Sequence, residues 1–102
     1  NNIFVSYECI IFDSNTHSVK AIDRYQEILD GYPNNAIQTP ETKSKIKTAP
    51  IVIGNGVWMG TRAIIFKGTH LGDEVIVGAA AVLSGLQVDH HKKVYGNPAI
   101  VH

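Results

Sequence analysis

The sequence predicts an all-β fold, a parallel β-helix built from repeats of six residues. An aliphatic residue recurs at every sixth position: Ile53, Met59, Ile65, Leu71, Val77 and Leu83. The slot four residues after each of the first five is small or apolar: Val57, Ala63, Thr69, Val75 and Ala81. A period of six is neither the helical period nor simple strand alternation, and it is typical of a solenoid of short strands and turns. An alternating β-hairpin protein would not hold this phase through six consecutive units.

The repeat also predicts how the chain is divided. Three repeats make one triangular coil, so residues 51–88 form about two regular coils in which two slots of six point inward. Glycine follows the aliphatic residue at Gly54, Gly60, Gly72 and Gly78. We expect a tight corner there, where a side chain would crowd or φ must be unusual. Residues 89–102 should cap the solenoid, with a turn at Gly96 and Pro98.

The same phase is fainter at the start of the chain. Val5 and Ile11 are six residues apart with Cys9 in the small slot, which predicts a first coil over residues 3–17. Extending the count places His17 in an inward slot. The chain does not begin with Met and opens on apolar alternation, so we expect the single β-helix domain, residues 1–102, to be the C-terminal part of a longer protein.

Residues 18–50 keep no phase and are predicted to be an inserted loop. Part of this loop should form a short helix that ends at Gly31 and Pro33, with one apolar face made by Val19, Ile22, Tyr25, Ile28 and Leu29. The polar stretch 34–50 is bracketed by prolines and is predicted to be exposed.

Composition excludes some functions. Lys plus Arg equals Asp plus Glu at 9 each, so no net field draws the chain to nucleic acid or to an anionic membrane. The apolar runs are too short for a membrane span. The single cysteine, Cys9, fits a reducing compartment, from which we expect a cytoplasmic location.

Three segments resemble the hexapeptide-repeat acyltransferases: "IVIGNGVWMG" at 51–60, "YGNPA" at 95–99 and "CIIFDSNTHSV" at 9–19. The likeness is greatest to the O-acetyltransferases of sugars, capsular polysaccharides, serine and xenobiotics. A hexapeptide run alone would establish only the fold, whereas the combination of repeat, VW-x-G and GNPA is specific. The resemblance implies a left-handed β-helix and a homotrimer. It also implies that acetyl-CoA lies in grooves between neighbouring subunits, and that a histidine deprotonates the acceptor.

His17 is the candidate general base under this resemblance. An alcohol that attacks a thioester must lose its proton, and histidine titrates close enough to neutrality to accept it. The alternative is that His17 is a loop histidine at a coil corner without a catalytic role. A base also needs an orienting partner; Asp13 is near in sequence, but a backbone carbonyl would serve equally well.

The resemblance also assigns an acetyl-CoA groove. Trp58 falls in an outward slot, where it either lines the groove or packs in the trimer interface. Around it the expected contacts are Gly60, Thr61, Gly78, Ala79 and Ser84, with Lys93, and Lys92 beside it, near the CoA phosphates. Any of the glycine and alanine positions could equally be a plain repeat corner, and the lysines a solvated tail. The chain departs from the family pattern at Gly85, where Lys is common, and at Ile100, where a basic residue is common.

Two other functions stay open. A zinc carbonic anhydrase class shares the fold, and His70, His90 and His91 raise that question, but its histidine–glycine–cysteine pattern is absent and we expect no metal. A non-catalytic trimeric scaffold is the second alternative, favoured by the departures at Gly85 and Ile100. The function favoured by the sequence is acetyl transfer from acetyl-CoA to a hydroxyl of a saccharide or similar small acceptor. The identity of that acceptor is not encoded in a recognisable motif.

Overall fold

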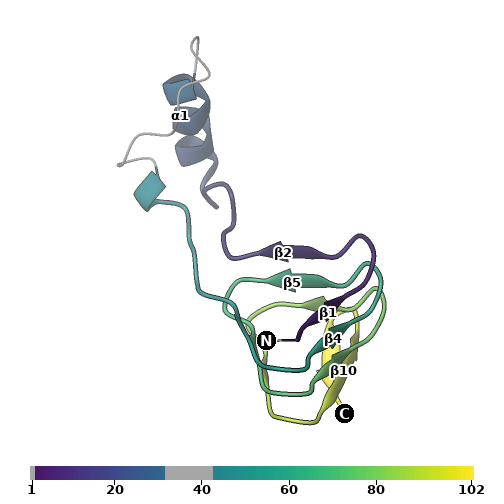
Figure 1. Cartoon of the computed structure of the whole chain (residues 1–102). Helices are drawn as coiled ribbons and strands as arrows, with labels where there is room; N and C mark the ends of the chain where they lie inside the picture. The colour runs from purple at the N-terminus through teal and green to yellow at the C-terminus, as the bar shows by residue number, and fades with distance from the viewer. Residues whose placement is uncertain (1, 32–42) are drawn as a thin grey trace. The chain divides into compact units, whose positions relative to one another are not determined.

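The computed structural model describes residues 2–31 and 43–102, and it separates into two compact units (Figure 1). The first unit comprises Asn1–Asp13 and Ala49–His102, and the second lies within Ser14–Thr48. None of the described helices is both long enough and apolar enough to cross a membrane.

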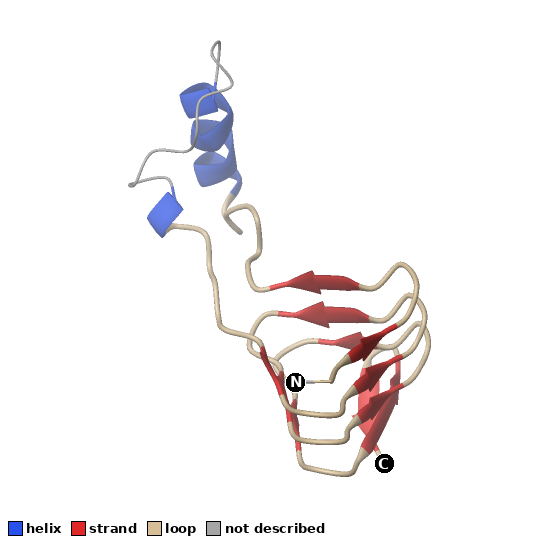
Figure 2. Cartoon of the chain, in the orientation of Figure 1, coloured by secondary structure: helices blue, strands red, loops and turns tan. Residues whose placement is uncertain are grey.

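The first unit is built from three parallel sheets that form its walls (Figure 2). Wall A contains β1 (Phe4–Val5), β4 (Trp58–Met59), β7 (Ile76–Val77), β10 (Lys93–Gly96) and β11 (Ala99–Val101). Wall B contains β2 (Ile10–Phe12), β5 (Ile64–Phe66) and β8 (Val82–Leu83). Wall C contains β3 (Val52–Ile53), β6 (His70–Leu71) and β9 (Gln87–Val88). Apart from β11, every strand pairs in parallel with a strand of an adjacent coil.

The register confirms the coil length that the repeat predicts. Met59 pairs with Val77 and Ile65 with Leu83, each one 18-residue coil further on. The last step is one residue shorter, because Leu71 pairs with Val88. The first coil keeps the phase, since Ile11 pairs with Ile65 across the inserted segment.

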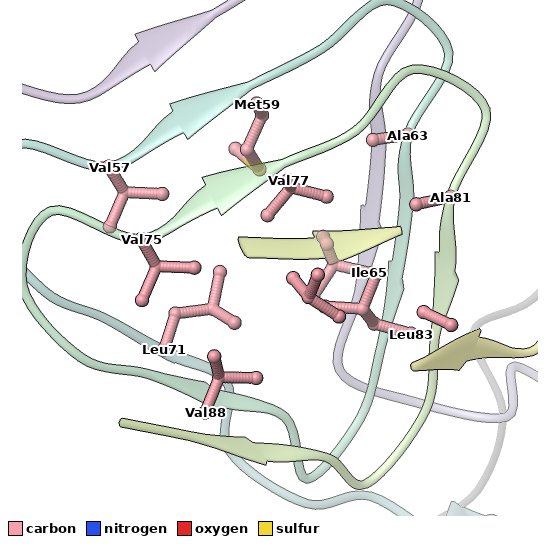
Figure 3. Close-up of a cluster of buried hydrophobic side chains, with 12 residues drawn as sticks. Val57, Met59, Ala63, Ile65, Leu71, Val75, Val77, Ala81, Leu83 and Val88 are labelled. Carbon is pink, nitrogen blue, oxygen red and sulfur yellow. The ribbon is translucent and has the colours of Figure 1, made fainter. Parts of the chain in front are cut away.

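The inward slots of the repeat form the hydrophobic core (Figure 3). Ten of the residues that the six-residue period assigns to the interior are buried: Val57, Met59, Ala63, Ile65, Thr69, Leu71, Val75, Val77, Ala81 and Leu83. The Oγ1 atom of Thr69 has no hydrogen-bond partner among the described residues, so its methyl group, and not its hydroxyl, suits this slot.

The glycines at the corners are required by crowding and not by an unusual φ. A Cβ on Gly60 would lie 2.6 Å from the amide nitrogen of Ala79 in the next coil, and one on Gly78 would lie 2.7 Å from Cβ of Tyr95. The left-handed backbone comes two residues later, at Arg62 (φ 62°) and Ala80 (φ 60°). Each of these two glycines therefore lets one coil stack closely on the next.

We expect Gly60→Ala to destabilise the fold by about 1–3 kcal/mol, because the added methyl meets rigid backbone of the next coil. Urea unfolding at fixed protein concentration would measure this, with the exposed neighbour Thr61→Ala as control, expected within about 0.5 kcal/mol of wild type. A Gly60→Ala chain as stable as wild type would show that stacking does not require this glycine.

The C-terminal cap follows the predicted turn. β10 ends at Gly96, and β11 returns antiparallel to it, with Val94 opposite Val101. The rings of Tyr95 and His102 stack at 3.9 Å, which fixes the last residue against β10.

In the second unit the predicted helix is present as α1 (Ala21–Gly31). Its described part runs to Gly31, whereas Pro33 and most of the stretch predicted as an exposed loop lie outside the described residues. The apolar side chains that predict the helix, such as Ile22 and Tyr25, are exposed.

Candidate functional site

The outer face of wall A carries the exposed tryptophan. Trp58 is 53% exposed, which confirms its outward slot, and it pairs with Phe4 on one side and Ile76 on the other. Ile76 in turn pairs with Lys93, so one outward column runs from Phe4 through Trp58 to a cation. A half-exposed indole in an apolar column is typical of a surface that a ligand or another protein covers.

The corner that follows Trp58 presents main-chain donors. Gly60 and Gly78 use their N–H groups within the solenoid, donating to the carbonyls of Val77 and Val94. Among the described residues, the N–H groups of Thr61 and Ala79 have no such acceptor, and both residues are exposed. Because Gly60 packs on Ala79, the two donors lie at adjacent levels of the same corner. Such a pair can hydrogen bond a carbonyl or amide of an extended ligand.

The remaining predicted groove residues are also at the surface. Ser84 is exposed directly after β8, and Lys93 is exposed on β10. Gly85 adopts φ 62°, a conformation that glycine tolerates better than lysine, which gives a backbone reason for the departure from the family pattern. The backbone of Lys93 is fixed by reciprocal hydrogen bonds with His102.

The three walls differ in their outer surfaces. Wall A shows Phe4 and Trp58, and wall B shows Ile10 and Phe12, all exposed apolar side chains. In wall C the outward positions that follow Val52 in register are His70 and Gln87, both exposed and polar. Two apolar walls and one mainly polar wall would suit an assembly that covers two faces of each subunit.

The candidate base lies in the second unit, outside the coil. The last strand before it, β2, ends at Phe12, and Ser14 forms an antiparallel bridge with Thr48. The inward position that the six-residue count gives His17 is therefore wrong: its side chain is 62% exposed. The count fails because the chain leaves the wall before the repeat would reach His17.

His17 has an acidic neighbour on α1. Its Nδ1 atom lies 3.5 Å from Oε2 of Glu27, whose side chain is only 4% exposed. The other oxygen of Glu27, Oε1, accepts a hydrogen bond from the N–H of Ser18 at 3.3 Å. The sequence reasoning missed Glu27 and named only Asp13, although the helical face opposite the apolar stripe could have suggested it.

His90 and His91 stand at the corner that follows β9, whereas His70 lies on β6 and His102 stacks on Tyr95. His90 accepts a hydrogen bond at Nδ1 from the N–H of Asp73, and Nδ1 of His91 lies 2.7 Å from Oε2 of Glu74. These pairs join one coil to the next. Among the described residues, no three histidine, cysteine or acidic side chains are grouped as a metal site would require.

Three curated relatives named as acetyltransferases match parts of the chain. It is 44% identical over 48 residues to a chloramphenicol acetyltransferase of Agrobacterium fabrum, 47% of this chain and 22% of that one. It is 30% identical over 67 residues to Escherichia coli K12 WbbJ, assigned as a lipopolysaccharide biosynthesis O-acetyl transferase, 66% of this chain and 34% of that one. A galactoside O-acetyltransferase of the same organism is 40% identical over 35 residues, 34% of this chain and 17% of that one. These matches cover about a third of the relatives' length or less.

Solved structures share the fold over the whole chain. A maltose O-acetyltransferase from Clostridium difficile 630 superposes with a TM-score of 0.67 at 24% identity, covering 100% of this chain and 55% of that one. A hexapeptide-repeat acetyltransferase from Vibrio cholerae, solved with acetyl-CoA, superposes with a TM-score of 0.62 at 20% identity. The superposition covers 98% of this chain and 52% of that one.

No protein-family model matches the chain. The relatives matched by sequence are acetyltransferases, and the structures matched by fold include a hexapeptide-repeat acetyltransferase. The resemblance inferred from the repeat and its flanking motifs is therefore confirmed: the chain is similar in sequence to acetyltransferases and shares its fold with a hexapeptide-repeat acetyltransferase.

Proposed function

We propose that this chain takes part in acetyl transfer from acetyl-CoA to a hydroxyl of a saccharide or similar small acceptor. The observation that carries the proposal is the exposed Trp58 followed by the two available N–H groups at Thr61 and Ala79. That surface offers an aromatic face and two main-chain donors to an extended amide-containing molecule, which is the chemistry of the pantetheine arm of CoA. The matched relatives act on saccharides and on chloramphenicol, according to their names.

In the proposed reaction His17 is the general base. Its imidazole takes the proton of the acceptor hydroxyl as the oxygen forms a bond to the acetyl carbonyl carbon. The carbon–sulfur bond then breaks, and the imidazolium returns the proton to the sulfur of CoA. No enzyme nucleophile is needed, because the thioester is already activated.

The other residues of the groove are proposed to bind acetyl-CoA. Trp58 covers the acyl arm, Gly60 and Gly78 keep the corner narrow, and the N–H groups of Thr61 and Ala79 donate to the arm. Ser84 is proposed as a polar contact, and Lys93, with Lys92, as the cationic partner of the CoA phosphates.

The assembly we propose is a homotrimer of left-handed coils. The apolar outer faces of walls A and B support it, because a monomer would leave Phe4, Trp58 and Phe12 in water. A contact between unlike walls can close into a ring. We expect the protein to act in the cytoplasm, consistent with its single cysteine.

Trp58→Ala tests the groove directly. We expect it to weaken acetyl-CoA binding about tenfold, roughly 1.4 kcal/mol, since the indole face is lost. Calorimetry would measure Kd, with the oligomeric mass determined on the same samples. The matched control is Val52→Ala, an apolar residue that is 50% exposed on wall C and should leave Kd unchanged.

Two outcomes would count against the groove. Equal weakening by Val52→Ala would mean that the loss is not specific to wall A. An absence of acetyl-CoA binding by a folded wild-type trimer would overturn the assignment and favour the non-catalytic scaffold.

A further inference from the structure

We propose that Glu27 is a positioning residue that fixes the tautomer of His17. The inference rests on the proposed function, because it concerns the base of that reaction. It starts from the burial of Glu27, whose side chain is 4% exposed, whereas Tyr25, on the other side of α1, is 58% exposed. A buried carboxylate is costly unless it is paired or hydrogen bonded.

The two partners of Glu27, His17 and Ser18, are adjacent in the sequence. Oε1 accepts the N–H of Ser18, and Oε2 lies 3.5 Å from Nδ1 of His17. Oε2 is buried and makes no hydrogen bond among the described residues. The imidazole is 62% exposed, so a small rotation of it can close the contact, and bonds of this kind are often long before substrate is bound.

The backbone that carries the histidine is also held by α1. The guanidinium of Arg24 donates to the carbonyl oxygens of Ser18 and Val19, at 3.0 and 2.5 Å. Arg24 is therefore engaged with the main chain, and among the described residues His17 is the side chain that faces the Glu27 carboxylate as an ion-pair partner. The helix holds both the segment after the histidine and the acid that faces the ring.

The tautomer of His17 follows from which of the two facing groups can donate a hydrogen bond. An ionised carboxylate only accepts hydrogen bonds, so it selects the tautomer in which Nδ1 carries the proton. Nε2 is then left as the acceptor for the hydroxyl proton of the substrate. When Nε2 has taken that proton, the ring is cationic and Glu27 stabilises it.

The first test is the tautomer in the wild-type chain. Long-range proton–nitrogen NMR at a pH where His17 is neutral reports which ring nitrogen carries hydrogen. We expect Nδ1–H to predominate for His17, and a predominance of Nε2–H would overturn the proposal. This measurement needs neither acetyl-CoA nor turnover, so it stands even if the proposed function fails.

The second test is Glu27→Gln, which keeps the shape and retains an amide oxygen for the N–H of Ser18. Its amide NH₂ would then face Nδ1 and favour the Nε2–H tautomer. We expect the tautomer to change and kcat to fall about 10²-fold, with KM for acetyl-CoA unchanged. The matched control is Asp23→Asn, one turn earlier on α1, where the carboxylate pairs with Lys45 at 3.1 Å. It should leave the tautomer unchanged.

A double variant separates positioning from plain destabilisation. If Glu27 acts through His17, adding Glu27→Gln to His17→Ala costs no further activity. Losses that multiply, or a Glu27→Gln chain with an unchanged His17 tautomer, would overturn the proposal. A wild-type chain without turnover would count against the proposed function and leave the tautomer result to decide the role of Glu27.

Discussion

His17→Ala should lower the rate of acetyl transfer by about 10²–10⁴-fold while acetyl-CoA binds as tightly as before. The reason is that in the proposed reaction the imidazole accepts the proton of the attacking hydroxyl, whereas the proposed CoA contacts belong to Trp58 and the corner after it. Steady-state kinetics with a panel of saccharide acceptors would measure kcat, and calorimetry would measure Kd for acetyl-CoA.

The control is His70→Ala, an exposed histidine on β6 for which we propose no role in transfer. It should keep wild-type turnover. If His70→Ala abolished activity while His17→Ala kept it, the base would be misassigned, and the histidines of the zinc alternative would have to be considered in its place.

Ile65→Ala should destabilise the fold by about 2–5 kcal/mol, because it removes a fully buried side chain from the centre of the core. Coils above and below hold the walls apart, so the cavity cannot collapse easily. Chemical denaturation would measure the free energy of unfolding at one protein concentration, since any assembly makes stability depend on concentration.

The matched control is Ile11→Ala, the same change one coil away in the same register. Ile11 is 44% exposed, so we expect its loss to cost clearly less. Equal costs at the two positions would contradict the packing described for the first coil, and would indicate that Ile11 is covered in solution.

The periodicity was sufficient to predict the core of the coils after residue 53, where equivalent inward slots stack on one another, but not in the first coil, where Val5 and Ile11 are exposed. This stacking is why Val57, Val75 and even Thr69 could be placed from spacing alone. The count failed at His17, where local backbone hydrogen bonds take the chain away from the wall. Periodicity carries no information beyond the point at which the repeat stops.

The candidate site was less predictable than the core. Trp58 could be placed outward from its slot, but the reason for glycine at Gly60 required the backbone of the next coil, because crowding and an unusual φ give the same preference. The helical period places Glu27 opposite the apolar stripe, but it does not show that the chain before α1 brings His17 back to that face, so the contact itself needed the structure.

The inserted segment, Ser14–Thr48, leaves the first unit after Asp13 and rejoins it at Ala49, and these two residues are hydrogen bonded to each other. The N–H of Ala49 donates to the carbonyl of Asp13 at 3.0 Å, and Ser14 bridges Thr48 immediately beyond. Because the two ends of the inserted segment are adjacent, its length and sequence can change while the stacking of the walls stays the same. The segment that carries His17 can therefore tolerate insertions and deletions that the stacked coils themselves could not accommodate.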